Sequence, residues 1–280
     1  MQSENSQSGV EIVSQGSLLT VTPFNTDKIN YSAGYTARGE INTFSLKSRK
    51  RLLELVARLQ SPETEGYRGT TSFLTLTTQK ILHPAKFKPL LFTWLKRLNR
   101  KQPRVSAIWR IEYQKRGATH AHLVLFNAPY INKKWIQETW GEVIDQAEPF
   151  TRIERINSQR KVMSYASKYI AKANDSGGFN NLPYLTERVD KATGEVAPLP
   201  SPGRQWGVFN RAGLPWSEHF IADIPLDGSW WLIRRYCQTL WGDLPLDDYN
   251  GFTIFCDEPF NHLCYITTMS REFISAAVSA

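Results

Sequence analysis

Residues 110–126 read RIEYQKRGATHAHLVLF, and this stretch predicts a β-hairpin. The segment 105–114 has the composition of a strand, and residues 115–118 form a glycine-containing turn. Residues 119–126 return as a second strand, in which alternation of polar and apolar residues gives way to a continuous apolar run. That run predicts that the second strand is buried.

The hairpin brings two histidines and a glutamate to one place. His120 and His122 share a strand face, because successive side chains of a strand point to opposite sides. If the turn centres near residue 116 or 117, Glu112 lies opposite His120 or His122, and both registers put it on that same face. Such a set can hold a divalent metal, since imidazole suits transition ions and a carboxylate also accepts Mg²⁺ or Mn²⁺. The alternative is two polar residues on a solvated sheet face.

Length and cysteine content limit the class of protein. The 280 residues suffice for one large domain, or for one domain with an appendage. Cys237, Cys256 and Cys264 form no CxxC pair, which favours a reduced, cytosolic protein over a disulfide scaffold. The opening MQSENSQSGV lacks the pattern of a signal peptide, and no apolar stretch has the roughly 18 residues that a membrane helix needs. We therefore expect no membrane partner.

Positive charge is concentrated in the middle of the chain. The net charge is +8, and Lys and Arg outnumber Asp and Glu more than twofold over residues 39–172, whereas acidic residues predominate after residue 173. A basic region of this size is expected to bind a phosphate backbone, although a solvated basic surface is the alternative. The candidate DNA-binding residues are Arg110, Lys115, Arg116, Arg160, Lys161 and Arg204.

Helices and strands alternate around the hairpin in an order that predicts an α+β fold. Polar composition predicts a flexible N-terminal tail over residues 1–38 and a long loop over 174–202. The last segment, 214–280, is rich in Trp and should be folded, but we assign no chemistry to it. An antiparallel sheet with helices packed on it fits this order of predicted elements: helix 45–60, strand 73–78, helix 84–101, the hairpin, helix 132–146 and strand 151–156.

A second informative stretch, residues 158–173, reads SQRKVMSYASKYIAKA. Tyr165, Lys168, Tyr169 and Lys172 stand at i, i+3, i+4 and i+7, so on a helix they occupy one face. Burying an unpaired lysine costs on the order of several kcal/mol, so this face should look onto solvent or an anion. A positioned phenolate can attack phosphorus, and a nearby ammonium group favours the phenolate. The alternative is a solvated helix whose tyrosines reach the surface.

Taken together, the motifs resemble those of rolling-circle replication initiators of the HUH endonuclease superfamily, which small plasmids and single-stranded DNA phages carry. The similarity spans roughly residues 70–211, and its motifs occur in the family's order. They are the apolar-Thr strand 73–78, His120-Ala121-His122 with Glu112 eight positions upstream, and YxxKYxxK at Tyr165–Lys172; the stretch Gly203–Gly207 and Asn210-Arg211 also resemble the segment that follows the nuclease domain in phage-type members.

The resemblance implies a nicking and joining domain over residues 39–213, with 214–280 as an accessory segment. Its sheet would be antiparallel and five-stranded, with both histidines on a central strand and the tyrosine helix beside them. A tyrosine would attack hairpin-presented, single-stranded origin DNA in the presence of Mg²⁺ or Mn²⁺, leaving a 5′-phosphotyrosine and a free 3′-OH primer. Tyr169 would attack first, Tyr165 would perform a later strand transfer, and Lys168 or Lys172 would screen the developing charge.

The motifs that are missing also bear on partners and alternatives. The sequence has no GxxxxGK[ST] motif, so we expect a host helicase to unwind the DNA, alongside a host polymerase and single-strand-binding protein in the bacterial cytoplasm. An HUH transposase or relaxase would use the same chemistry, and a non-catalytic nucleic-acid-binding protein would retain the site without activity. A zinc hydrolase is disfavoured, because the sequence has no HExxH motif and no cysteine ligand cluster.

Overall fold

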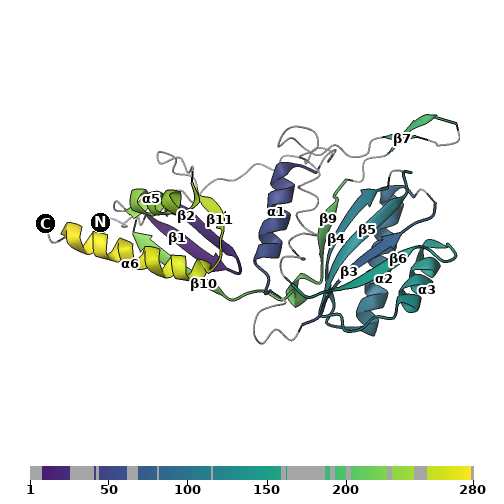
Figure 1. Ribbon diagram of the computed structural model, residues 1–280, viewed down its shortest axis with the longest axis horizontal. Helices are drawn as coiled ribbons and strands as arrows, with labels where there is room; N and C mark the ends of the chain where they lie inside the picture. Colours follow the sequence, from purple (N-terminus) through teal and green to yellow (C-terminus); the bar gives the residue numbers. More distant parts are fainter. Residues whose placement is uncertain are drawn as a thin grey trace, which may run out of the picture. The chain divides into compact units, whose positions relative to one another are not determined.

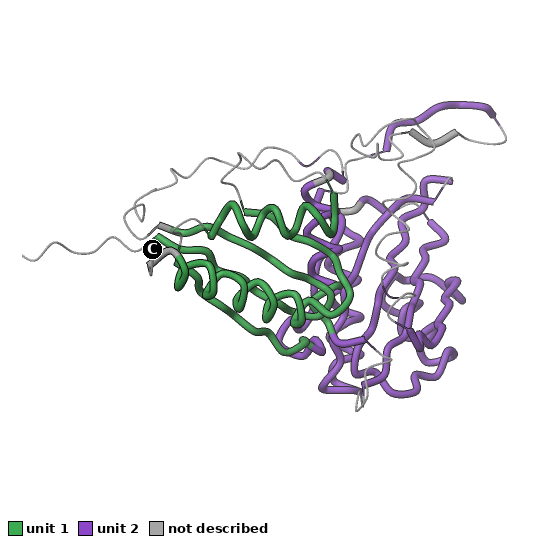
Figure 2. The backbone as a smooth tube through the Cα atoms, turned by 60° about the vertical axis from the view of Figure 1, so that its left-hand side comes forward, with its two compact units in different colours: residues 1–37, 57–59, 216–280 green, residues 38–56, 60–215 purple. Residues whose placement is uncertain are grey.

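The computed structural model divides the chain into two compact units (Figures 1 and 2). Unit 2 comprises residues 38–56 and 60–215 and contains the hairpin, and unit 1 comprises 1–37, 57–59 and 216–280. The residues that the structure describes are 8–25, 41, 44–61, 69–80, 82–114, 116–158, 162, 187–189, 193–199, 203–225, 229–242 and 251–278.

Unit 2 is built on a five-stranded antiparallel sheet in the order β6-β3-β5-β4-β9. The predicted hairpin forms the β4–β5 pair, and β5, which carries both histidines, is the central strand. The α+β class is therefore confirmed, and the sheet has the strand number that we expected. The bounds are β3 Thr71–Thr77, β4 Ser106–Tyr113, β5 Thr119–Phe126, β6 Thr151–Ile156 and β9 Trp206–Phe209.

Two helices, α2 (Pro84–Lys101) and α3 (Lys133–Ile144), cover one face of this sheet (Figure 1). Both begin where local chemistry predicts. Pro84 occupies the first turn of α2, where its missing N–H costs no hydrogen bond, and the side chain of Asn132 accepts the backbone N–H of Lys134 at the start of α3. A third helix, α1 (Leu46–Ala57), begins after Ser45, whose hydroxyl accepts the N–H of Ser48.

The strand alternation separates a core face from a functional face. Leu74, Leu76, Ala121 and Leu123 point toward α2 and α3 and are fully buried there with Trp94. Their neighbours along the same strands point to the opposite face, which holds both histidines and Glu112. The core face packs against the two helices, so the functional face is held on a rigid support.

A tight connection of five residues sets the register of the hairpin. Gly117 has φ +84°, a left-handed conformation that costs glycine little and other residues more. The backbone N–H of Gly117 donates to the carbonyl of Gln114, and the N–H of Gln114 donates to the carbonyl of Ala118. As a result Glu112 pairs with His120, one of the two registers that the sequence left open.

Unit 1 has its own four-stranded antiparallel sheet, in the order β10-β1-β2-β11. Val10, Ile12, Leu19 and Val21 of the N-terminal hairpin are buried in a core shared with two helices. The elements are β1 Ser8–Gln15, β2 Leu18–Asn25, β10 His219–Pro225, α5 Ser229–Trp241, β11 Phe252–Phe255 and α6 Pro259–Val278.

The prediction of a flexible tail over residues 1–38 is therefore wrong for residues 8–25. Polar composition suggested disorder, but polar and apolar residues alternate in β1, and the apolar ones fill a core. One partner strand lies far away in sequence, since Val10 pairs with Ile224. Such a partner has no local signature in the sequence.

The predicted loop over residues 174–202 also contains regular structure. A short two-stranded ribbon pairs β7 (Glu187–Val189) with β8 (Val196–Pro198). Among the described residues, no helix combines the length and the apolar character needed to cross a membrane.

Candidate metal centre

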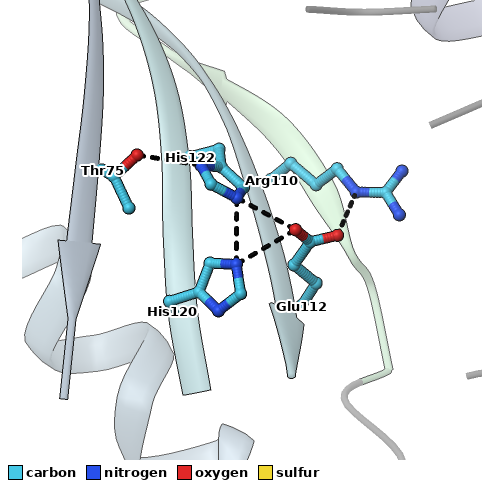
Figure 3. A network of polar contacts seen from close by, with 5 residues as sticks. All are labelled: Thr75, Arg110, Glu112, His120 and His122. Atoms are coloured by element: carbon cyan, nitrogen blue, oxygen red, sulfur yellow. Dashed lines mark hydrogen bonds and ion pairs between the residues drawn. The ribbon is translucent and has the colours of Figure 1, made fainter. Parts of the chain in front are cut away.

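Three side chains of the β4–β5 hairpin converge on one point of the functional face (Figure 3). Nε2 of His120 lies 3.0 Å and Nε2 of His122 lies 2.9 Å from the same oxygen, Oε1 of Glu112. The two Nε2 atoms are 2.9 Å apart. The predicted grouping of Glu112, His120 and His122 is thus present in the structure.

The orientation of His122 is set by strand β3. Thr75 is the register partner of His122, and its Oγ1 lies 3.1 Å from Nδ1 of the imidazole. The ring of Phe73 stacks on the same imidazole at 5.4 Å between centroids. Contacts to the remote ring nitrogen are how proteins hold a metal-binding histidine in position, and here they leave Nε2 facing Glu112.

The electrostatics of the cluster favour the forms that bind metal. Burial opposes ionisation of Glu112, but hydrogen bonds from His120 and His122, with the positive charges of His122 and Arg110, outweigh it and hold the carboxyl pKa well below its usual range. Burial lowers the pKa of His122 below 6.5, although Glu112 partly offsets this effect. At neutral pH the site therefore presents an ionised carboxylate and a neutral imidazole.

The donor set fits a divalent cation. Two ring nitrogens and a carboxylate oxygen lie within 3.0 Å of one another. Only hydrogen bonds can stabilise these three contacts if no cation is bound. Ligands held at about 2.1 Å from an octahedral ion stand about 3.0 Å apart when they are neighbours, close to the spacing found here. Two nitrogens and one carboxylate oxygen accept several divalent metals, and the set does not single out one of them.

Arg110 lies beside the cluster. Its Nε is 3.8 Å from Oε2 of Glu112, and its guanidinium lies 4.2 Å from the centre of the Phe44 ring. Only 11% of its side chain is exposed, so Arg110 holds a largely buried position next to the carboxylate. Its predicted role in DNA binding stays a prediction. No local pattern in the sequence marks Phe44, because this contact depends on how a distant segment packs.

The hydrogen bonds of Arg116 differ from those that we expected of a DNA-binding residue. It donates to the backbone carbonyls of Thr78 and Gln79 and to the side chain of Gln114, which ties the hairpin turn to the end of β3. Arg204 is exposed, as predicted for a phosphate contact. Three further candidates, Lys115, Arg160 and Lys161, lie outside the described residues.

The predicted nucleophile stretch also falls outside the described residues, and this applies to Tyr165, Lys168, Tyr169 and Lys172. The structure does describe the point where the predicted helix starts: the N–H of Val162 donates to the carbonyl of Ser158, which is a helical hydrogen bond. Tyr113 adjoins Glu112 in sequence but points to the other side of the sheet. Burial raises its pKa to about 12, so its phenol is a poor nucleophile.

Comparison with known proteins gives one match to a family. Residues 71–174, less than half of the chain, match the family described as replication-associated protein ORF2. The matched segment contains the metal-centre residues and the predicted tyrosines, and the similarity supports a role as a replication initiator. No curated protein matches.

One solved structure is similar to part of the chain. It is the crystal structure of the hypothetical protein ORF119 from Sulfolobus islandicus rod-shaped virus 1, with 15% sequence identity and a TM-score of 0.30. The similarity covers 42% of this chain and 90% of that protein.

Proposed function

We propose that this protein is a rolling-circle replication initiator of the HUH type, which nicks and rejoins single-stranded origin DNA. One observation carries the proposal: Glu112 of β4 converges with His120 and His122 of the central strand β5, in a segment that matches a replication-associated family. In this proposal the three residues hold Mg²⁺ or Mn²⁺, and Tyr169 and Tyr165 are the nucleophiles. The activity would take place in the cytoplasm of a bacterial host.

The residues of the site have separate tasks in the proposed reaction. A divalent ion held there would polarise a non-bridging oxygen of the phosphodiester. Thr75 and Phe73 hold His122 in place, and Arg110 lies against Glu112, so the ligand set is rigid before DNA arrives. Positioning of this kind favours reaction, because the cost of orienting the groups is met during folding.

The covalent step exchanges one phosphate ester for another. The phenol oxygen of Tyr169 attacks phosphorus and loses its proton, the bond from phosphorus to the 3′ oxygen breaks, and that oxygen takes up a proton. The products are a 5′-phosphotyrosine and a free 3′-OH, which primes synthesis. Because the phosphoester bond is retained, a later attack by a 3′-OH rejoins the strand without ATP.

The second tyrosine allows a second transfer while the first remains bound to DNA. Tyr165 precedes Tyr169 by four residues, a spacing that puts both on one face of a helix. Lys168 and Lys172 have the spacing to serve the same face and to stabilise phenolate or phosphate charge. Unwinding and synthesis would fall to a host helicase, polymerase and single-strand-binding protein.

A covalent-adduct assay tests the proposal. The full chain is incubated with circular single-stranded DNA of its own replicon and Mn²⁺, and denaturing electrophoresis is used to detect protein that stays attached to DNA. We expect an adduct that disappears when EDTA is present. Binding of DNA without any adduct would overturn the proposal and favour a non-catalytic binding protein.

A further inference from the structure

A cavity of about 330 Å³ opens in unit 2 at the β9 edge of the sheet. Its volume is at the lower end of the range for small-molecule pockets, about 300–1,000 Å³, which suits a ligand of the size of one nucleotide. It is separate from the metal centre, since none of the three proposed ligands lines it. Phe44, Ser48, Arg51, Arg204, Gln205 and Trp206 are among the residues that form its wall.

The register places this cavity on the same face as the metal centre. Trp206 of β9 pairs with Arg110 of β4, and Arg110 pairs with His122 of β5, so the three side chains point to one side of the sheet. Two strand spacings of about 4.8 Å separate Trp206 from His122, a span of about 10 Å.

Charge at the rim favours an anion. Arg51 and Arg204 are exposed, and within the described residues neither forms an ion pair with a carboxylate. Guanidinium groups bind phosphate well, because their planar donors match its oxygens.

The backbone of Gln205 fixes the edge of the cavity. Its carbonyl accepts the N–H of Ile111, which ties the segment before β9 to β4. Gln205 is only 4% exposed.

Aromatic side chains supply the rest of the wall. The indole Nε1 of Trp206 donates to Oγ of Ser48 on α1, which holds the ring in place. Phe44 contributes a second ring and also stacks against Arg110, next to the metal centre. A fixed indole is a good stacking surface for a nucleobase, and stacking accepts any base.

We propose that this cavity binds one nucleotide of the single-stranded DNA substrate, next to the phosphate at the metal centre. Arg51 and Arg204 hold its phosphate, and Trp206 stacks on its base. Because stacking accepts any base, the site binds cytosine and thymine alike. This inference rests on the proposed function for the identity of the substrate.

Binding without chemistry tests the inference. Fluorescence anisotropy is measured for the full chain with short oligodeoxycytidine and oligothymidine in EDTA, so that binding is followed without cleavage. We expect the two oligonucleotides to bind with similar affinity, because a stacking surface accepts either base. Each variant is compared with the wild type in both titrations, and its melting temperature is recorded to confirm that it is folded.

Two variants test the stacking surface and the phosphate contact separately. Trp206→Leu should weaken binding of both oligonucleotides on the order of tenfold, because stacking is lost for every base. Arg204→Ala should lower the slope of log affinity against log salt by about 1. The matched control is Arg100→Ala, an exposed arginine on α2, which should leave this slope unchanged.

Unchanged affinity of Trp206→Leu, or an unchanged salt slope in Arg204→Ala, overturns the nucleotide site. Binding of dCMP as tight as that of oligodeoxycytidine overturns the assignment to single-stranded DNA. The adduct assay separates the two proposals. A wild-type adduct together with unchanged affinity of Trp206→Leu refutes the cavity alone, whereas weakened binding by Trp206→Leu without any wild-type adduct refutes the nicking activity alone.

Discussion

The hydroxyl of Thr75 lies 3.1 Å from Nδ1 of His122, directly opposite it on the neighbouring strand. This contact occupies one ring nitrogen and leaves the other for Glu112. Thr75→Val keeps the shape of the side chain but removes the hydroxyl. We expect Mn²⁺ affinity, measured by isothermal titration calorimetry, to fall about 10–100-fold, the usual effect of losing a partner of a metal ligand.

Thr93→Val is the matched control for this change, because Thr93 lies on α2 and its hydroxyl donates to the carbonyl of Pro89. It should leave Mn²⁺ affinity unchanged. Equal affinities of the Thr75→Val variant and the wild type would show that the hydroxyl does not orient the imidazole.

Removing both imidazoles tests the metal site itself. The double variant His120→Ala, His122→Ala should lose metal-dependent cleavage of single-stranded DNA, while thermal unfolding stays cooperative because the apolar face of the sheet is untouched. Cleavage is followed by electrophoresis and unfolding by circular dichroism. Undiminished nicking by the folded variant would contradict the assignment of His120 and His122 as metal ligands.

Acid should weaken metal binding in a defined direction. Burial lowers the pKa of His122 below 6.5, so this imidazole stays neutral to a lower pH than an exposed histidine. The pKa of Glu112 is also lowered, mainly because hydrogen bonds from the two histidines outweigh its burial. Mn²⁺ affinity should therefore begin to decline at a lower pH than it would for a site built on an exposed histidine, as protons compete for His122.

The same shifts predict the effect of pH on stability without metal. A folded-state pKa that is depressed means that the unfolded chain binds protons more readily, so stability is present at higher pH and is lost as pH falls. The melting temperature in EDTA should accordingly fall on acidification, first through His122 and then through Glu112. His122→Gln should reduce the first part of that decline. A melting temperature that rises on acidification would contradict both assignments.

Salt tests the basic middle segment, residues 39–172. If several phosphates are neutralised by Lys and Arg, affinity for single-stranded DNA should fall roughly tenfold or more between about 50 and 200 mM salt. Anisotropy with a labelled oligonucleotide measures the slope. A flat response would exclude binding through phosphates.

The two tyrosines should divide the reaction between them. Tyr169→Phe removes only the phenol oxygen and should abolish most of the first covalent adduct. Tyr165→Phe should still nick but should not release closed circles, because the second transfer lacks its nucleophile. Adduct yield and closed-circle product are read from the same gel. The reverse pattern would reverse the order of attack, and no effect from either change would place the nucleophile elsewhere.

Local patterns were enough to predict the elements of the candidate metal centre. The predicted strands 119–126 and 151–156 have the bounds of β5 and β6, and Pro84 marked the start of α2. Strand parity alone placed Glu112 on the face of the two histidines. These signals are readable because each depends on residues a few positions apart, through side-chain direction, helix capping or the conformation of Gly117.

Only the tertiary structure decided which distant segments meet. Val10 pairs with Ile224, Phe44 lies against Arg110, and Ser48 of α1 lines the cavity together with Trp206 of β9. Each of these contacts joins segments that are scores of residues apart. The sequence by itself determined the short-range geometry of the β4–β5 hairpin. Pairing between distant segments depends instead on which arrangement buries the most apolar surface across the whole unit. No local pattern in the sequence records that choice.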